Sequence, residues 1–108
     1  MNIIETSKYK KTYKKIIIDK HLSEEKEVLN IVLGIIELYP NLQSLMNSIY
    51  QRKYDIRQKE GNLKEYISVS INQRIRLIIK PISELPYNYV EIVDIELVQV
   101  NDDYYKRM

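Results

Sequence analysis

Two stretches near the N-terminus place apolar side chains at helical spacing. In residues 8–20 the apolar positions recur at i, i+4, i+7 and i+8, and lysines occupy the other face. Leu22–Tyr39 repeats the pattern after Ser23, a good capping residue, and Pro40 cannot extend a helix. The pattern predicts two amphipathic helices, preceded by a short strand at Asn2–Thr6.

The second half of the chain alternates apolar and polar side chains, which is typical of strands. Tyr66–Ile71 and Arg74–Lys80 each alternate with a period of two, and residues 72–73 between them suit a tight turn. Tyr89–Val100 is longer, and its apolar phase switches near Val93, which indicates a bulge or burial on both faces. The pattern therefore predicts three strands joined by short connections.

Less regular segments connect these elements. We expect a short helix or irregular cover at Asn41–Tyr50, a polar loop at Arg52–Asn62 and a polar tail at Asn101–Met108, and Pro81 ends a strand or marks a sheet edge. The order of elements predicts an α+β fold, in which two N-terminal helices pack on a small twisted, mostly antiparallel β-sheet. With 108 residues, we expect a single domain, residues 1–108.

The net charge of +2 conceals a segregation of charge along the chain. Residues 51–80 hold eight basic residues against three acidic ones, so this part is the predicted anion-binding region. There is no cysteine and only one histidine, His21, which excludes thiolate sites and histidine metal clusters. No apolar run approaches the roughly 20 residues of a membrane span and no signal peptide is visible, which predicts a cytoplasmic protein without a membrane partner.

Common catalytic motifs are missing, but arginine and tyrosine can support one reaction. RNA carries its own nucleophile, the 2′-hydroxyl, so a protein that aligns the backbone and stabilises the phosphorane charge can cleave it without a metal. Arg76 is the best candidate because it lies mid-strand and its planar group can bind two phosphate oxygens. A merely solvated side chain is the alternative for an arginine there. Tyrosine can stack on a base, or transfer a proton where cations lower its pKa.

Three segments of the sequence are similar to motifs of one protein family. GNLKEYISVSINQRIRLIIK (61–80) has a basic loop and two strands, VEIVD (90–94) is a late strand, and KYKKTYKK (8–15) is a basic opening helix. Together they resemble the RelE/HigB/ParE superfamily of bacterial toxins. The resemblance implies a type II toxin in a hetero-oligomer with its cognate antitoxin. It also implies a metal-independent endoribonuclease, without a cofactor, that cleaves mRNA on the ribosome.

The resemblance also implies roles for particular residues. Arg76 takes the place of a strand arginine, Lys64 that of a loop cation, and Tyr104 or Tyr105 that of an aromatic residue in the tail. The predicted catalytic residues are Arg76, Lys64, Tyr104 and Tyr105. The predicted RNA-binding residues are Arg57, Lys59, Arg74, Lys80 and Lys106, and no metal ligand is predicted.

Three departures from the family pattern leave other functions open. Asp94 is followed by Ile95 and Glu96, where HigB-type toxins often continue with tyrosine and histidine. Ser70 stands where the pattern has an arginine, and Asp103 stands where a histidine precedes the tyrosine pair. Without that histidine, Asp103, Tyr104 or Lys106 would have to transfer protons. The alternatives are a ParE-like toxin that inhibits DNA gyrase by binding it, and a toxin-derived binding module without activity.

Overall fold

The computed structural model describes residues 1–102, and none of their helices is long and apolar enough to cross a bilayer. The helices are α1 (Ser7–Ile18), α2 (Ser23–Leu38), α3 (Leu42–Met46) and α4 (Ile49–Lys53), with 3₁₀ turns η1 (Lys20–Leu22), η2 (Gly61–Leu63) and η3 (Tyr89–Glu91). The strands are β1 (Asn2–Glu5), β2 (Arg57–Gln58), β3 (Ile67–Ser70), β4 (Ile75–Pro81) and β5 (Asp94–Asp102).

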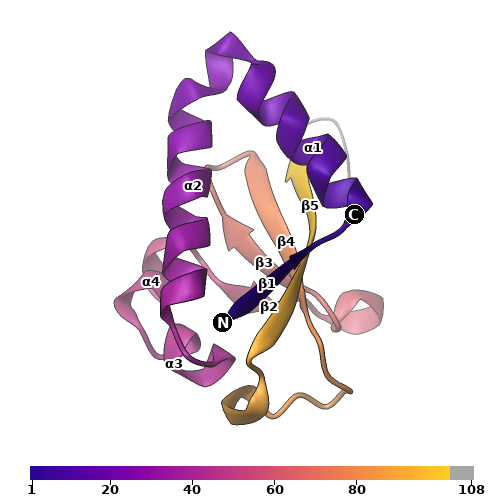
Figure 1. Ribbon diagram of the computed structural model, residues 1–108. Coiled ribbons are helices and arrows are strands. Elements are labelled where there is room, and N and C mark those ends of the chain that lie inside the picture. The colour runs from indigo at the N-terminus through magenta and orange to yellow at the C-terminus, as the bar shows by residue number, and fades with distance from the viewer. Residues whose placement is uncertain (103–108) are drawn as a thin grey trace.

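The strands form one five-stranded sheet in the order β1-β5-β4-β3-β2 (Figure 1). β1 runs parallel to β5, and the other neighbouring strands pair antiparallel. The first strand therefore lies beside the last, and α1 and α2 follow β1 before the chain returns to the sheet. The predicted α+β fold, with two N-terminal helices on a mostly antiparallel sheet, is confirmed.

Local signals in the sequence fix the helix ends. Thr6 caps α1 through its side-chain oxygen, and Pro40 stands two residues beyond the end of α2. Asn41 begins α3 with a capping box, in which it and Ser44 exchange hydrogen bonds between side chain and backbone. The segment 41–50, predicted as a short helix or irregular cover, therefore holds α3 and the start of α4.

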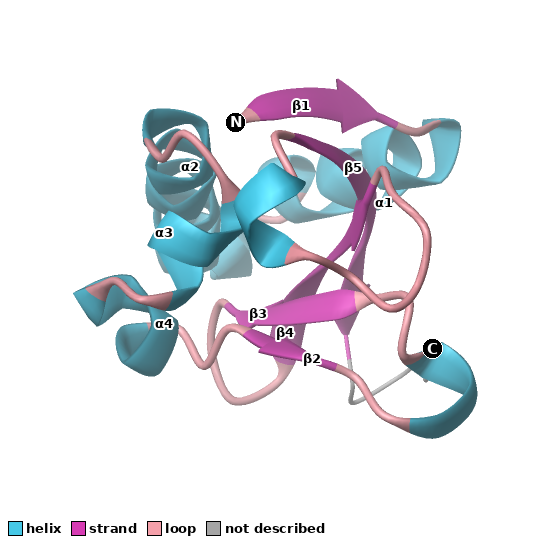
Figure 2. Cartoon of the chain, turned by 90° about the horizontal axis from the view of Figure 1, so that it is seen from below, coloured by secondary structure: helices cyan, strands magenta, loops and turns pink. Residues whose placement is uncertain are grey.

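The core lies between the helices and one face of the sheet. Figure 2 shows α2 and α3 together to one side of β2, β3 and β4. α1 is joined to β5 by Thr12, whose hydroxyl oxygen accepts a hydrogen bond from the Val100 amide at 2.9 Å. The core side chains of the helices are Tyr9, Ile16, Leu29, Val32, Ile36, Leu42 and Leu45, and those of the sheet include Ile67, Val69, Ile75, Leu77, Ile79, Ile95 and Leu97.

The opposite face of the sheet carries Ile78 at its centre and polar side chains around it, and much of it is buried. Ser68 on β3 and Gln99 and Asn101 on β5 are at most 6% exposed. They share this face with Arg76, because residues of β4 alternate between the two faces. Polar groups that are fixed on strands and shielded from water can hold a neighbouring charged side chain in one orientation.

The predicted strand Tyr89–Val100 is wrong at its start. Residues 89–91 form η3, and β5 begins only at Asp94. The turn is closed by the backbone, where the Ile92 amide bonds to the Tyr89 carbonyl at 3.3 Å. The switch in apolar phase therefore marks the end of a turn and not a bulge.

The irregularity in strand register lies farther along β5. Ile78 pairs with Gln99, but its neighbour Ile79 pairs with Leu97. Val98 is therefore the extra residue of a β-bulge, which changes the local twist of the sheet. A bulge near Val93 was one of the two explanations for the switch in apolar phase, and the observed bulge lies five residues beyond that position.

Two further segments differ from the predicted elements. Asn101 and Asp102, expected to begin the tail, extend β5 and pair with β4. The expected loop Arg52–Asn62 contains β2, which pairs with β3. Both segments gain backbone hydrogen bonds from strands already in the sheet, which no hydrophobic pattern signals. Pro81 is, as predicted, the last residue of its strand.

Candidate functional site

Arg76 lies in the middle of β4, on the sheet face that points away from the core. Its strand partners are Ser70 on β3 and Asn101 on β5. The side chain is 20% exposed, and its Nη1 donates a hydrogen bond to Oγ of Ser68 at 3.1 Å. The guanidinium is therefore held by the sheet and still accessible to a ligand.

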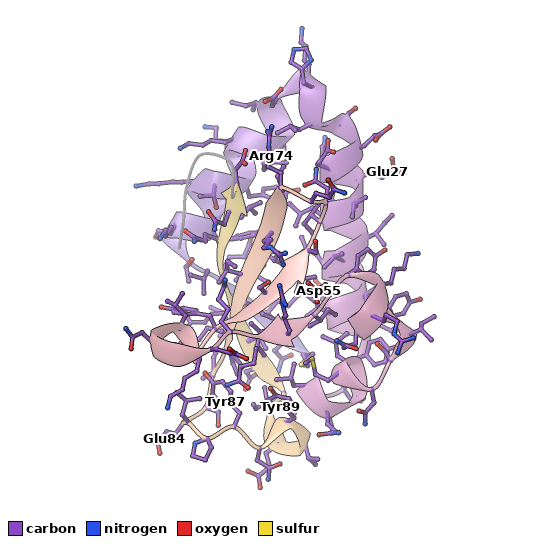
Figure 3. The ribbon with its side chains drawn as sticks, turned by 180° about the vertical axis from the view of Figure 1, so that it is seen from behind. Glu27, Asp55, Arg74, Glu84, Tyr87 and Tyr89 are labelled. Atoms are coloured by element: carbon purple, nitrogen blue, oxygen red, sulfur yellow. The ribbon has the colours of Figure 1, made fainter. Side chains whose placement is uncertain are left out.

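Asp55 brings two arginines together. Its Oδ2 lies 3.7 Å from Nη1 of Arg76 and 3.5 Å from Nε of Arg57 on β2. The backbone φ of Asp55 is +45°, in the left-handed region that aspartate tolerates better than most residues. Figure 3 shows Asp55 on the outer side of the sheet. Because an exposed ion pair stabilises a fold only slightly, its main effect here is to orient the guanidinium groups.

The two arginines line a hollow of about 510 Å³, which we call the arginine hollow. Its walls come from β2, η2, β3 and β4, so segments distant in sequence meet there. Three basic side chains and the carboxylate of Glu60 line it, and the Asp55 carboxylate pairs with two of the three, so a small excess of positive charge favours an anionic ligand. The lining residues are Arg57, Gln58, Lys59, Glu60, Leu63, Ser68 and Arg76.

A second hollow of about 380 Å³ adjoins the first, and Gln58 lines both. We call it the tyrosine hollow. Its remaining lining residues are Lys64, Leu85, Pro86, Tyr87 and Tyr89. The loop after η2 supplies the lysine, and the segment between β4 and η3 supplies most of the apolar surface.

Hydrogen bonds hold the two tyrosine rings in place. The Tyr87 hydroxyl donates to the Glu65 carbonyl at 2.7 Å, and the Tyr89 hydroxyl donates to the side-chain oxygen of Gln58. Burial raises the pKa of both tyrosines, and the nearby Glu65 raises the pKa of Tyr87 further. Both hydroxyls therefore stay protonated at neutral pH. Figure 3 shows the two tyrosines close together at one end of the molecule.

No protein-family model and no curated protein sequence matches the chain, whereas several solved structures do. A YoeB/ParE toxin from Agrobacterium tumefaciens has a TM-score of 0.64 at 12% identity, covering 94% of this chain and 98% of that one. YafQ from E. coli has a TM-score of 0.65 at 11% identity, covering 96% and 94%. A chain of the heterotetrameric YoeB-YefM toxin-antitoxin complex from Staphylococcus aureus has 0.61 at 17% identity, covering 94% of each. This chain has the fold of the RelE/YoeB-like toxins.

Within this toxin fold, the predicted site residues separate into groups. Arg57, Lys59 and Arg76 line the arginine hollow together. Lys64, predicted to act beside Arg76, lines the tyrosine hollow instead. Lys80 lines neither of the two hollows, and its Nζ lies 3.7 Å from Oε2 of Glu65.

Arg74 lies at a different place in the toxin fold. Its Nε is 3.1 Å from Oδ1 of Asp102, and both residues line a third hollow of about 340 Å³ beside α1. The view from behind shows Arg74 at the far end of β4 from the tyrosines (Figure 3). Tyr104, Tyr105 and Lys106 lie outside the described residues.

Some residues that line the two hollows or contact their arginines were not predicted from the sequence. Ser68 had a usable signal, because alternation along its strand places it on the face of Arg76. No sequence pattern marks Asp55 as a site residue, since its contacts with the arginines depend on the turn that leads into β2. Tyr87 and Tyr89 lie in an irregular segment, where two aromatic residues after Pro86 give only a weak signal of a packed loop.

Proposed function

We propose that this chain is the toxin of a type II toxin–antitoxin pair and that it cleaves mRNA on the ribosome. The observation that carries the proposal is the arginine hollow, where Arg57, Lys59 and Arg76 face one space on the outer side of the sheet. A phosphodiester suits the planar, bidentate donors of the two arginines, and the Lys59 ammonium adds a further positive charge. The fold shared with YoeB, ParE and YafQ toxins supports the class of protein.

The proposed reaction uses the 2′-hydroxyl of the RNA as nucleophile. Its oxygen attacks the adjacent phosphorus, the P–O5′ bond breaks, and the products are a 2′,3′-cyclic phosphate and a 5′-hydroxyl. Arg76 and Arg57 donate to the non-bridging oxygens, whose negative charge increases in the phosphorane. A base takes the proton of the 2′-hydroxyl, and an acid gives one to O5′. We assign proton transfer, or stacking on a base, to Tyr104 or Tyr105.

Asp55 is a positioning residue in this proposal. It contacts both arginines, so their guanidinium groups already converge before RNA binds. Prior orientation lowers the barrier because less freedom has to be lost when the substrate is held for in-line attack. The other predicted RNA-binding residues, which are Lys59, Arg74, Lys80 and Lys106, contribute attraction to the phosphate backbone.

The proposed partners are a cognate antitoxin, the ribosome and mRNA. The S. aureus neighbour is a toxin-antitoxin complex, which supports a hetero-oligomer for this chain as well. An antitoxin that places an acidic segment over the arginine hollow would exclude RNA by occupying the same donors. We propose a cytoplasmic site of action, where mRNA is translated, and no cofactor.

Induction of the chain without an antitoxin tests the function. We expect growth arrest, with loss of full-length mRNA before any response to DNA damage. Arrest with intact mRNA and an SOS response would contradict the proposal and favour a gyrase-binding toxin. Unchanged growth of cells that contain the folded protein would contradict it too, and would favour the inactive binding module.

A further inference from the structure

We propose that the tyrosine hollow binds the nucleotide next to the cleaved phosphodiester, with its base against Tyr87 and Tyr89 and its phosphate on Lys64. The inference rests on the proposed function and adds a second subsite to it. The two hollows share Gln58 as a common wall. An RNA strand held at Arg76 can therefore continue into the tyrosine hollow without leaving the surface.

The walls of the tyrosine hollow suit a nucleobase. Two tyrosine rings, Pro86 and Leu85 present apolar surface, and Leu85 is 39% exposed although it is a large apolar residue. Proteins that bind single-stranded RNA stack unpaired bases on aromatic side chains in this way. The volume of about 380 Å³ lies within the usual range of small-ligand sites, roughly 300–1,000 Å³.

The hollow is already organised for stacking. The hydroxyls of Tyr87 and Tyr89 bond to groups of the protein, and the Gln58 amide donates to the Lys64 carbonyl at 2.6 Å. These bonds hold the rings in one orientation, so little side-chain freedom is lost when a base binds. Both rings pack partly against the core, and their remaining surface lines the hollow, where a base can contact it. The subsite should therefore accept every base and discriminate only by stacking strength.

The charge of the hollow matches a phosphate. Lys64 is exposed at its rim, and the adjacent carboxylate of Glu65 lies 3.7 Å from Lys80. This pairing directs the Glu65 charge toward another lysine, and Lys64 can attract a phosphate of the incoming strand. The position of Lys64 thus assigns it to the nucleotide beside the cleavage site and not to the phosphorane.

An NMR titration of the full chain, made by cell-free synthesis, tests the subsite. The probe is a trinucleotide RNA that carries 2′-O-methyl groups, so it has no nucleophile and stays intact. We expect saturable shifts of the Tyr87 and Tyr89 ring signals together with those of Arg57 and Arg76. A control trinucleotide that lacks the base of the nucleotide next to the cleavage site should leave the ring signals of Tyr87 and Tyr89 unchanged. Tyr87→Leu should weaken binding about tenfold, and the ring-preserving Tyr87→Phe less than about threefold.

Three outcomes would overturn the subsite. Shifts at Arg57 and Arg76 alone would show that RNA binds the arginine hollow without contacting the tyrosine hollow. The proposed function would then stand. Shifts of Tyr87 and Tyr89 with a purified antitoxin but not with RNA would assign the hollow to a protein contact. Absence of shifts at both hollows with millimolar RNA would also exclude it. The proposed function is tested separately, by the growth and the mRNA integrity of induced cells, so its failure can be told apart from the failure of the subsite.

Discussion

At the scale of single residues, the account depends on the face of β4 that carries Arg76. Its sequence neighbours Ile75 and Leu77 are at most 1% exposed, so a shift of one residue in register would bury the guanidinium. The packing of these two side chains therefore fixes the direction of the arginine. Asp55 and Ser68 then fix its orientation on the surface.

Substitution of Arg76 should reduce RNA cleavage without unfolding the protein. Arg76→Ala removes a donor to the phosphorane, and we expect cleavage of a reporter mRNA to fall about 100-fold or more. Arg76→Lys keeps the charge but loses the planar pair of donors, so its cleavage rate should lie between those of the wild type and Arg76→Ala. Primer extension on the reporter during cell-free translation measures all three rates.

Arg52→Ala is the matched control for this prediction. Arg52 is an exposed arginine on α4 and lines neither the arginine hollow nor the tyrosine hollow. Its loss should leave the cleavage rate unchanged, and circular dichroism should show the same fold in every variant. An Arg76→Ala protein that cleaves at the rate of Arg52→Ala would remove Arg76 from the catalytic residues.

At the scale of elements, a hydroxyl in the middle of α1 forms a hydrogen bond with the backbone of β5. Thr12 accepts a hydrogen bond from the amide of Val100, which is 6% exposed. Thr12→Val keeps the shape but leaves that amide without its acceptor, so we expect a loss of about 1–3 kcal/mol in the free energy of unfolding. Thr12→Ser keeps the hydroxyl and should lose less. Urea unfolding measures both, and equal losses would show that the hydrogen bond is not the cause.

The two glycines of the chain should respond to alanine in opposite directions. Gly34 lies within α2, and an added Cβ meets nothing within 4 Å, so Gly34→Ala should stabilise the fold by up to about 1 kcal/mol. Gly61 has φ +65°, and an added Cβ there also meets nothing within 4 Å. Gly61→Ala should therefore destabilise by about 1–2 kcal/mol through the backbone alone. Urea midpoints that move in the same direction would contradict this explanation.

The sequence predicts elements best where packing is regular. α2 and β3 follow from their periods because each buries one face in the core. The start of β5 does not follow, since the turn at residues 89–91 is closed by backbone bonds that any residues could make. The two-residue strand β2 is likewise defined by its partner β3 and not by its own pattern.

The residues of the candidate site likewise include some that the sequence predicts and others that only the fold brings together. Arg57, Lys59 and Arg76 could be predicted because positive charge gathers in one part of the sequence. Which hollow each cation would line could not be predicted, as Lys64 demonstrates, because that depends on the path of the loop after η2. Asp55 and the two tyrosines become part of the site only through contacts between segments far apart in the chain.

At the scale of the whole molecule, Tyr9 links stability to alkaline pH. It is 2% exposed in the core, and burial first, then Tyr13 and Glu5, raise its pKa above the ordinary value of 10.0. The unfolded chain loses this proton near pH 10 while the folded chain keeps it. Stability is therefore complete below about pH 10 and falls as the pH rises toward the folded pKa.

Tyr9→Phe should remove much of that decline. The wild-type free energy of unfolding should fall above about pH 10 by up to about 1.4 kcal/mol per pH unit on account of Tyr9, and the variant lacks this contribution. Urea unfolding near neutral pH and near pH 11 measures the difference. The same decline in wild type and variant would show that other groups cause it.

The central claim is that the arginine hollow cleaves mRNA through the 2′-hydroxyl. The most direct measurement is a transcriptome-wide map of 5′-hydroxyl ends in cells that express the chain or its Arg76→Ala variant. We predict new 5′-hydroxyl ends, in phase with codons, in cells that express the wild-type chain and not in those that express the variant. Growth arrest without such ends, or the same ends in both, would contradict the account.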